Sequence, residues 1–529
     1  MNTLVLRDVE IDGVGGIDVL IRDGVVAAVA PGLHVPSSAE AVDGHGGALL
    51  PGLHDHHIHL HALAADRASV RCGPPAVRTA DDLARALASA SASGQGWIRG
   101  VGYSEEVAGL LDSSALDRLH ADRPVRIQHR SGAVWFLNSL AAALAGLATT
   151  DHPGVERDEK GHPTGRVWRA DTWLRERLPH TGPPSLADVG AELASYGITG
   201  LTDATPDLTA STVEHLRVSH ADGSVPQRVR LLGAPLDFAG SETFAAGPCK
   251  IVLADSGLPD LDDLATTIRR AHDVGRGVAV HCVSREAFAI LLAVLTEVGT
   301  VPGDRIEHGA LIPADAIDDV RRLGLQVITQ PGFLADRGDA YLRDVPPGDL
   351  PDLYRCRSLL AGGVLLALSS DAPYGPVDPW TVLSAAVTRT CPTGDVLGTN
   401  ERVTAAVALD RYLAPLDHPG SAARRVRVGV SADLVLLDHS LSEVLAGPTA
   451  DAVRTTIIGG RIAYHRTDGA GIHRGGSTSS RTIEVAADAS LGSSPAGFAD
   501  QGVYLPGGQG EVDVAGRVHS STGGRDTDG

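Results

Sequence analysis

The chain has 529 residues, of which 43% are hydrophobic, and a formal net charge of −20 at pH 7. This composition is typical of a soluble globular protein, and the negative charge argues against binding to nucleic acid or to anionic membranes. The first residues carry charges where a signal peptide would be apolar, and no long uncharged apolar span follows, so we expect a cytoplasmic protein. The five cysteines are scattered without a CxxC pair, which indicates free thiols.

Strands are predicted at both ends of the chain. The stretches TLVLRDVEI and IDVLIRDGVVAAVA near the start alternate apolar and polar residues and break at DG turns. Near the end, SADLVLLD and TTIIGGRIAYH have the same character. We therefore expect residues 1–52 and 396–466 to form one small β-sandwich domain built from both termini.

Between these ends, residues 53–395 alternate short apolar runs with helical stretches such as DDLATTIRRAHDVG and REAFAILLAVLTEVG. This rhythm predicts an α/β fold of repeated βα units, and the length fits a (β/α)₈ TIM barrel with insertions at 61–120 and 140–190. The barrel needs eight strands, but nine candidates are found, beginning near Leu53, Val125, Ile198, Val229, Cys249, Val278, Arg305, Leu325 and Val364. One candidate must be extra.

The last segment, residues 467–529, is dominated by Gly, Ser, Asp and Thr and has no apolar periodicity. Such a sequence buries too little surface to offset the entropy lost on ordering. We predict a disordered tail.

The stretch PGLHDHHIHLHAL at residues 51–63 contains five histidines. If it is a strand, alternation puts His57 and His59 side by side on the polar face, which would point to the barrel axis. Neutral imidazole is a common zinc ligand, so this pair predicts a metal site. The alternative is a strand end that is merely polar.

Three further residues of metal-ligand type follow other predicted strands. His281 ends GVAVHCV, His308 ends RIEHGAL, and Asp371 follows the apolar run VLLALSS. Each alone is more typical of a hydrogen-bonded structural residue. Together they lie at the carboxyl ends of successive strands, where barrel enzymes keep their active sites.

Lys250 is one of only two lysines among 45 basic residues, and it lies inside the apolar strand CKIVLA. Burial lowers the pKa of a lysine, and a neutral amine can react with CO₂ to give a carbamate whose two oxygens can bridge two metal ions. Arginine cannot do this, because its pKa exceeds about 12. The alternative is a lysine that snorkels at a strand edge.

These motifs resemble the amidohydrolase superfamily of metal-dependent hydrolases, and within it the N-substituted formamide deformylase-like (amidohydrolase 3) branch. PGLHDHHIHL, Lys250, VHC, IEH and SSDAP occur in the order of that superfamily. WIRGVGY, WFLNSLAAALAGL, GHPTGRV, GITGLTDA and IIGGRIAY add to the likeness, which covers about residues 1–466.

The resemblance implies a distorted (β/α)₈ barrel with a β-sandwich from both termini. It implies that His57 and His59 bind one metal ion, that His281 and His308 bind a second, and that carbamylated Lys250 bridges them. Asp371 would contact metal and hydroxide and shuttle a proton. Two zinc ions are expected, with iron, manganese or nickel as alternatives.

Two departures from the family pattern affect the substrate side. Relatives often have a histidine after the glycine before WxxN, where this chain has Ala133 in SGAVWFLN. The branch often reads Lys-Ile-Phe-x-Asp-Gly around the lysine, whereas this chain reads KIVLADSG. We expect a reshaped pocket.

The first functional hypothesis is an amidohydrolase that cleaves a C–N bond of an amide, N-substituted formamide or related small molecule with metal-activated hydroxide. Asp371 would act as general base and then acid. Loop positions suggest substrate-pocket residues, and the segment 331–354 is either a lid or a surface loop. The pocket candidates are Tyr103, Trp135, Asn138, Gln330 and Tyr374.

Two other functions stay open. The same site could hydrolyse an ester, a lactone or an organophosphate. A non-catalytic oligomeric barrel is the alternative of another class, and the complete ligand set argues against it. A homo-oligomer is compatible with the sequence, but the sequence does not determine the oligomeric state.

Overall fold

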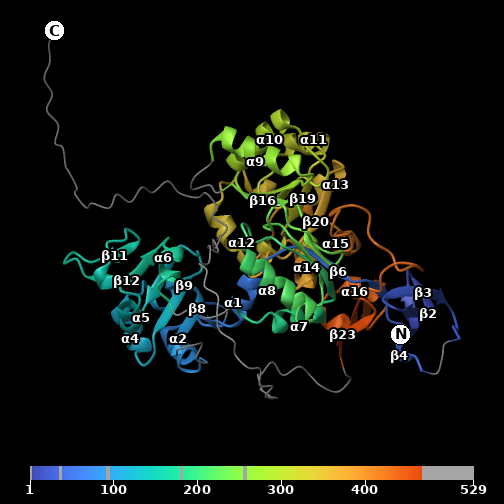
Figure 1. Ribbon diagram of the computed structural model, residues 1–529, viewed down its shortest axis with the longest axis horizontal. Helices are drawn as coiled ribbons and strands as arrows, with labels where there is room; N and C mark the ends of the chain where they lie inside the picture. The colour runs from blue at the N-terminus through green and yellow to red at the C-terminus, as the bar shows by residue number, and fades with distance from the viewer. Residues whose placement is uncertain are drawn as a thin grey trace, which may run out of the picture.

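The computed structural model of the protein describes residues 3–34, 38–74, 76–90, 96–178, 183–253 and 259–466. Figure 1 shows a central body of strands and helices, with a lobe on the left and a strand-rich unit on the right. The tail predicted at 467–529 lies outside the described residues.

The strand-rich unit is a sandwich of two four-stranded sheets, in the orders β3-β2-β1-β4 and β23-β22-β21-β5. Leu6 and Val19 of the first sheet and Leu434 and Leu436 of the second are buried in one hydrophobic core. Residues 3–51 and 434–465 therefore meet in this unit. Its strands are β1 (Thr3–Ile11), β2 (Val14–Arg22), β3 (Val25–Ala30), β4 (Glu40–Asp43), β5 (Leu49–Pro51), β21 (Leu434–Leu437), β22 (Val453–Ile458) and β23 (Arg461–His465).

The central body contains the parallel strands that the βα rhythm predicts. Eight of the nine predicted strand starts fall within one residue of a central strand. The ninth, Val125, begins a strand of the lobe, so it is the extra candidate. The central strands are β6 (Leu53–Ile58), β13 (Ile198–Asp203), β14 (Arg228–Leu231), β15 (Phe244–Ala246), β16 (Cys249–Val252), β17 (Val278–Cys282), β18 (Arg305–His308), β19 (Gln326–Thr329) and β20 (Leu365–Leu368).

These strands form a barrel-like arrangement of two parallel sheets, β15-β14-β13-β6 and β16-β17-β18-β19-β20, and not the single closed sheet that we expected. Pro248, which has no N–H to donate, lies between β15 and β16. Near this gap a hydrogen bond joins the two sheets, from Lys250 N of β16 to the backbone oxygen of Leu232, directly after β14, at 3.0 Å. At the other joint, Asp371 N donates to His57 O at 2.8 Å. The described strands therefore adjoin at both joints without a continuous ladder.

Most helices cover the central strands, and their apolar faces follow the helical period. In α9, Leu264, Ile268 and Ala271 are buried, and Asp260 caps the first turn. The helix α15 falls in the segment expected to join the sandwich, yet it packs on β20 and β6. The helices of this body are α1 (Leu60–Arg67), α7 (Ala187–Ser195), α8 (Ala210–Ala221), α9 (Leu261–Asp273), α10 (Arg285–Val298), α11 (Ile317–Arg322), α12 (Gly332–Asp344), α13 (Arg357–Ala361), α14 (Pro379–Thr388) and α15 (Ala405–Tyr412); α16 (Leu441–Ala446) follows β21.

The two predicted insertions and the segment between them build the lobe. Its sheet has six strands in the order β11-β12-β10-β9-β8-β7, and Leu83, Ile127 and Phe136 lie in one of its hydrophobic clusters. The lobe contains β7 (Val70–Arg71), β8 (Ile98–Tyr103), β9 (Val125–His129), β10 (Val134–Leu137), β11 (Val155–Arg157) and β12 (Pro163–Trp168), with α2 (Ala80–Ala88), α3 (Glu105–Ala108), α4 (Ser113–Leu119), α5 (Ser139–Leu144) and α6 (Asp171–Arg175).

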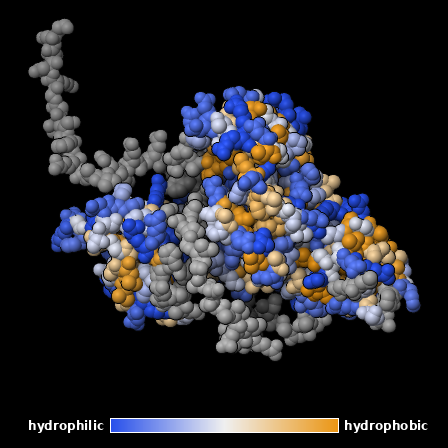
Figure 2. Space-filling model, in the orientation of Figure 1, coloured by the Kyte–Doolittle hydropathy of each residue, from blue (hydrophilic) through white to orange (hydrophobic). Residues whose placement is uncertain are grey.

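Polar residues cover most of the visible face, with hydrophobic residues interspersed (Figure 2). Among the described residues, every helix is too short or too polar to span a lipid bilayer.

Candidate metal centre

The six residues predicted as metal ligands all come from the central strands or follow them directly. His57 lies in β6 and His59 precedes α1, while Lys250, His281 and His308 lie in β16, β17 and β18. Asp371 is on the turn after β20. Parallel strands present their carboxyl ends at one edge, so ligand side chains from distant parts of the sequence lie close together there.

Asp371 is the centre of this group. Its Oδ1 lies 3.3 Å from His57 Nε2 and 3.2 Å from His59 Nε2, and its Oδ2 lies 3.8 Å from His308 Nδ1. One ligand atom from each of His57, His59 and Asp371 lies within 4.8 Å of the other two, a spacing that could hold a metal ion. The structure therefore brings together the first predicted ligand pair and the predicted aspartate.

The second predicted pair lies directly beside the first. The ring centroids of His57 and His308 are 4.8 Å apart, and those of His308 and His281 are 4.5 Å apart. With His59, whose centroid is 5.4 Å from that of His57, the four imidazoles form one continuous row.

Two buried acceptor atoms face each other in this centre, and their arrangement indicates whether a metal ion fits between them. His57 Nδ1 is hydrogen-bonded to Glu307 Oε2, a carboxylate that accepts, so the imidazole proton sits on Nδ1. His57 Nε2 therefore presents a lone pair to Asp371 Oδ1, and both atoms are buried without a hydrogen-bond partner. Two opposed lone pairs repel unless a cation lies between them, so the donor set fits a divalent metal ion.

Glu307 and Arg305 support His57 from behind. Arg305 Nε lies 2.5 Å from Glu307 Oε1, although neither atom makes an aligned hydrogen bond. Both side chains are fully buried, so the ion pair offsets the cost of burying each charge. A carboxylate on the second ring nitrogen fixes the tautomer and orientation of a metal-binding histidine.

The other imidazoles have similar supports. His59 Nδ1 lies 3.2 Å from Thr205 Oγ1. His308 Nδ1 lies 3.0 Å from Gln330 Oε1, and Gln330 Nε2 donates to Ser369 Oγ at 2.9 Å. The amide oxygen of Gln330 accepts from Nδ1–H and leaves His308 Nε2 available as a ligand atom.

Burial favours the neutral form of His57, His281 and His308, which is the form that binds metals. Desolvation lowers the pKa of His57 and His308 well below its usual range, and nearby Lys250 adds to the effect. Desolvation, followed by Lys250, lowers the pKa of His281 to about 3.

Lys250 is buried, with 7% of its surface exposed, and it pairs with Ala279 in the register of β16 and β17. Burial lowers the pKa of its ammonium group, while Glu307 and Asp371 partly oppose that shift. The lowered pKa favours the uncharged amine that carbamate formation requires.

The backbone at two of these positions adopts the left-handed region, which is uncommon outside glycine. His308 has φ of 71° and Asp371 has φ of 53°. Asp55 helps to hold the turn before Asp371, because its Oδ1 accepts from Ser370 N and from His57 N, both at 3.2 Å. Such conformations cost free energy and persist where surrounding bonds enforce them.

The five predicted pocket residues lie in two places. Tyr374 is at the centre, with its ring 5.4 Å from that of His59, and Gln330 supports His308. Tyr103, Trp135 and Asn138 belong to the lobe.

The lobe residues have local structural contacts. Tyr103 OH donates to Gly109 O, Trp135 lies under the guanidinium of Arg126, and the amide of Asn138 bonds four backbone groups. Their role in a substrate pocket stays a prediction.

The segment predicted as a lid or surface loop contains the kinked helix α12. Phe333, Leu334, Tyr341 and Tyr354 bury it in its own hydrophobic cluster. The segment is therefore packed, and a lid motion stays a prediction. Val252, which takes the Phe position of the Lys-Ile-Phe-x-Asp-Gly pattern, ends β16, and residues 254–258 lie outside the described residues.

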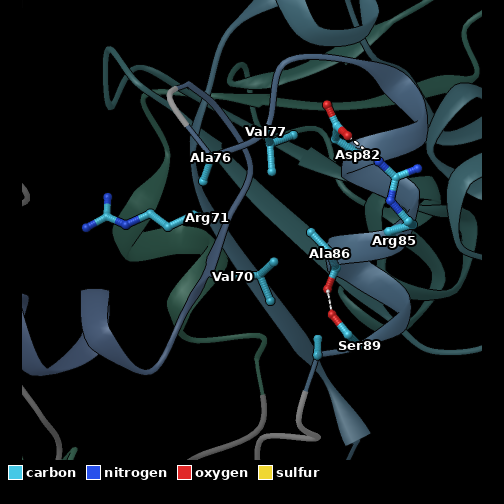
Figure 3. Close-up of a pocket in the computed structure, with 9 residues that line it drawn as sticks. Val70, Arg71, Ala76, Val77, Asp82, Arg85, Ala86 and Ser89 are labelled. Carbon is cyan, nitrogen blue, oxygen red and sulfur yellow. Dashed lines mark hydrogen bonds and ion pairs between the residues drawn. The ribbon is translucent and has the colours of Figure 1, made fainter. Parts of the chain in front are cut away.

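An open hollow in the structure lies on the lobe, between β7 and α2 (Figure 3). None of the predicted metal ligands lines it, and an Asp82–Arg85 ion pair lies at its wall. We place the chemistry at the metal centre because the hollow offers no comparable set of converging ligands. It is lined by Val70, Arg71, Ala76, Val77, Asp82, Arg85, Ala86, Ser89 and Ala90.

Sequence reasoning missed the supporting residues. Glu307 could have been found from the sequence, because a carboxylate buried within RIEHGAL needs a hydrogen-bond or ion-pair partner. Asp203 did as well: it ends β13, and its carboxylate accepts from Leu60 N at 2.8 Å and Thr205 N at 3.0 Å.

Comparison with known proteins gives one consistent result. The sequence model of the amidohydrolase family matches residues 40–464. The chain is 26% identical to the N-substituted formamide deformylase of Arthrobacter pascens over 522 residues, covering 85% of this chain and 95% of that protein. It is 25% identical to the putative amidohydrolase YtcJ of Bacillus subtilis strain 168 over 403 residues, covering 66% and 75%.

A solved structure shares the fold. An uncharacterized metal-dependent hydrolase from Pyrococcus horikoshii OT3 matches with a TM-score of 0.68 and 20% identity, covering 83% of this chain and 98% of that one.

We expect Glu307→Gln to weaken metal binding by about 10- to 100-fold, because an amide holds the His57 ring less firmly and cannot raise its basicity. The measurement is competition of the protein with a chromophoric chelator for zinc. Glu297→Gln is the matched control, since Glu297 is an exposed glutamate that pairs with Arg269 at the surface. Equal zinc affinities for the wild type and Glu307→Gln, with unchanged circular dichroism, would contradict this role.

We expect the metal-free protein to lose stability as the pH falls from 7.5 to 5.5. Six buried histidines have a pKa depressed by desolvation, so below about pH 6.5 the unfolded chain binds more protons than the folded one. Each group contributes up to about 1.4 kcal/mol per pH unit. Burial raises the pKa of Asp55 to about 6, so this single carboxyl binds more protons in the folded chain and partly opposes the loss of stability. Scanning calorimetry should show a lower Tm at pH 5.5, and an unchanged Tm would refute the account. The histidines are His54, His56, His57, His61, His281 and His308.

Proposed function

Because the chain belongs to the amidohydrolase family, we propose that this hydrolase of carbon–nitrogen bonds cleaves an amide, an N-substituted formamide or a related small molecule with the help of divalent metal ions. The observation that carries the proposal is the pair of opposed, buried acceptors, His57 Nε2 and Asp371 Oδ1, at 3.3 Å. The likeness to the deformylase of Arthrobacter pascens supports the choice of bond.

His57, His59 and Asp371 would hold one ion, and His281 and His308 would hold the second. Imidazole and carboxylate ligands suit zinc, and also iron, manganese and nickel. When bound, such ions lower the pKa of water toward about 7 and polarise the carbonyl of the substrate.

Asp371 would carry the proton. Its carboxylate takes a proton from the attacking water and delivers it to the leaving nitrogen, so that the amine departs neutral. Asp371 has the position for both transfers, because its two oxygens lie among His57, His59 and His308. The buried surroundings keep the carboxylate away from bulk water, which strengthens its interactions with the reacting groups.

Lys250 would serve as a carbamate between the two ions. The lone pair of its neutral amine attacks the carbon of CO₂, and the N–C bond forms as one C–O π bond opens onto its oxygen. One proton then passes from the nitrogen to water. The product is an anionic group with two oxygens, formed at a position where burial disfavours the ammonium ion. Three imidazoles, of His57, His281 and His308, lie within electrostatic range of this side chain.

The test combines elemental analysis of the purified protein with turnover of matched amide, formamide, ester and lactone substrates. We expect bound transition metal, a preference for the C–N substrates, and a loss of about 10²- to 10⁴-fold in kcat for Asp371→Asn, which cannot accept a proton. His57→Ala should lose metal. Purified protein without transition metal, or full turnover by His57→Ala, would refute the proposal. A preference for esters or lactones would assign the site to the other hydrolase class.

A separate experiment tests the carbamate. We expect Lys250→Ala to lose the second metal ion and its activity, and added acetate or propionate to restore part of both, because a small carboxylate can enter the space of the carbamate. Lys250→Arg should not be rescued, since its guanidinium fills the site and stays charged. Mass spectrometry of the native protein and metal content measure the outcome. Full metal content in Lys250→Arg would contradict the role.

A further inference from the structure

The lobe carries a group of reactive side chains that the metal-dependent reaction does not use. Glu105 begins α3, the helix that follows β8, while His129 ends β9 and Ser131 lies in the turn after it. β8 and β9 are parallel neighbours in the sheet of the lobe (Figure 1), and Tyr103 pairs with His129 in their register. Open sheets bind ligands at the carboxyl ends of parallel strands, because the segments that follow the strands lie together there.

The three side chains form one continuous chain of hydrogen bonds. Ser131 Oγ lies 2.7 Å from His129 Nδ1, and His129 Nε2 lies 3.0 Å from Glu105 Oε2. Both distances are normal for hydrogen bonds of these groups. A hydroxyl, an imidazole and a carboxylate therefore follow one another in the order that activates a serine as a nucleophile.

The neighbouring bonds fix the tautomer of His129. The carboxylate of Glu105 accepts, so the imidazole proton sits on Nε2. The backbone N–H of Ser131 donates to Nδ1 at 3.1 Å, which independently requires a lone pair on that atom. The hydroxyl of Ser131 therefore donates its proton toward Nδ1, and His129 is oriented as its general base.

Glu105 is ionised, as this arrangement requires. Desolvation raises the pKa of its carboxyl group, but the interactions with its own backbone N–H and with His129 outweigh that effect, and the pKa lies below its usual range. A carboxylate on Nε2 stabilises the imidazolium that forms when Nδ1 takes a proton.

A substrate can reach the serine from solvent, while the imidazole is held firmly. Ser131 is exposed, and 49% of the Glu105 side chain and 13% of the His129 side chain are accessible. The ring of His129 lies edge-on to that of Phe136, with centroids 6.5 Å apart and planes at 78°, and Phe136 is fully buried. The nucleophile is therefore accessible and its base has one orientation.

We propose that Ser131, His129 and Glu105 form a second catalytic site, which transfers the acyl group of a small activated ester first to Ser131 and then to water. This activity goes beyond the metal-dependent reaction, because these three groups supply the nucleophile and the base themselves.

The chemistry follows from the order of the groups. Ser131 Oγ bonds to the ester carbonyl carbon as its proton passes to His129 Nδ1, and the π electrons of the carbonyl move onto its oxygen. When the carbonyl re-forms, the bond to the alcohol oxygen breaks, and the alcohol leaves with the proton from Nδ1. Water then attacks the acyl-serine and gives a proton to Nδ1, which returns it to Ser131 Oγ as the acid departs.

Ser131 also has a simpler structural role in the turn between β9 and β10. Its Oγ accepts from Ala133 N at 3.3 Å, and Gly132 has φ of 71°. A serine that only stabilises a turn gains no reactivity from it. The rate at which Ser131 forms covalent adducts therefore separates the two roles.

The experiment treats the full-length, metal-loaded protein with p-nitrophenyl acetate and with a fluorophosphonate, and locates the adducts by peptide mass spectrometry. We expect one adduct per chain, at Ser131, formed about 100-fold faster than in His129→Asn, a factor typical of a general base. Glu105→Gln should slow the reaction about fivefold, the factor that an exposed ion pair supplies. Ser131→Ala should remove the adduct.

Ser139→Ala is the matched control and should leave the labelling unchanged. Ser139 is an exposed serine of the same lobe, but its hydroxyl donates to a carboxylate, that of Asp117, and not to an imidazole. His57→Ala separates the two sites, because the metal-dependent reaction does not acylate the chain. The Ser131 adduct should form equally fast in this variant.

Two results would overturn the proposal and leave Ser131 only its role in the turn. One is an adduct at Ser131 that forms no faster than an adduct at Ser139. The other is an unchanged labelling rate in His129→Asn with the circular dichroism of the wild type. If His129→Asn does not fold, the comparison of Ser131 with Ser139 in the wild-type protein decides.

Discussion

Two buried acceptors, His57 Nε2 and Asp371 Oδ1, face each other across 3.3 Å, and much of the structure serves to keep them there. Their lone pairs repel in a medium of low dielectric constant, so the arrangement costs free energy until a cation lies between them. The joint between the two central sheets sets this geometry. Asp371 N donates to His57 O at 2.8 Å and His59 N to Ala372 O at 2.9 Å, so the backbones that carry the acceptors are bonded to each other.

The surrounding residues offset part of this cost. Glu307 accepts from His57, Arg305 pairs with Glu307, and both are inaccessible to solvent. An ion pair at such depth is expensive to build, and removing one partner leaves a buried charge. Its benefit is a single orientation of the His57 ring, which a metal ligand needs. The left-handed backbone at Asp371 also costs free energy. It persists because Asp55 and the joint between the two sheets hold the turn.

The centre also has an open side and a closed side. Lys250 and Glu307 lie on the buried side among the strands, where burial controls the charge of the lysine. His59, Tyr374 and Arg337 lie on the accessible side, where α12 is kinked. The lobe has its own hydrophobic clusters and is built around a separate sheet.

The sequence alone determined much of the strand and helix order, because hydrophobic periodicity is local. Eight of the nine predicted strand starts fall within one residue of a central strand, and the ninth, Val125, begins β9 of the lobe. It also proposed His57 and His59 as metal ligands from strand alternation, and His281, His308 and Asp371 from their places at the ends of apolar runs. Tertiary structure alone decided that Val125 belongs to the lobe, that Gln330 supports His308, and that Glu307 contacts His57. Strand pairing and side-chain partners depend on residues far apart in the chain, such as Glu307 and His57 at a separation of 250 positions, and no local pattern encodes them.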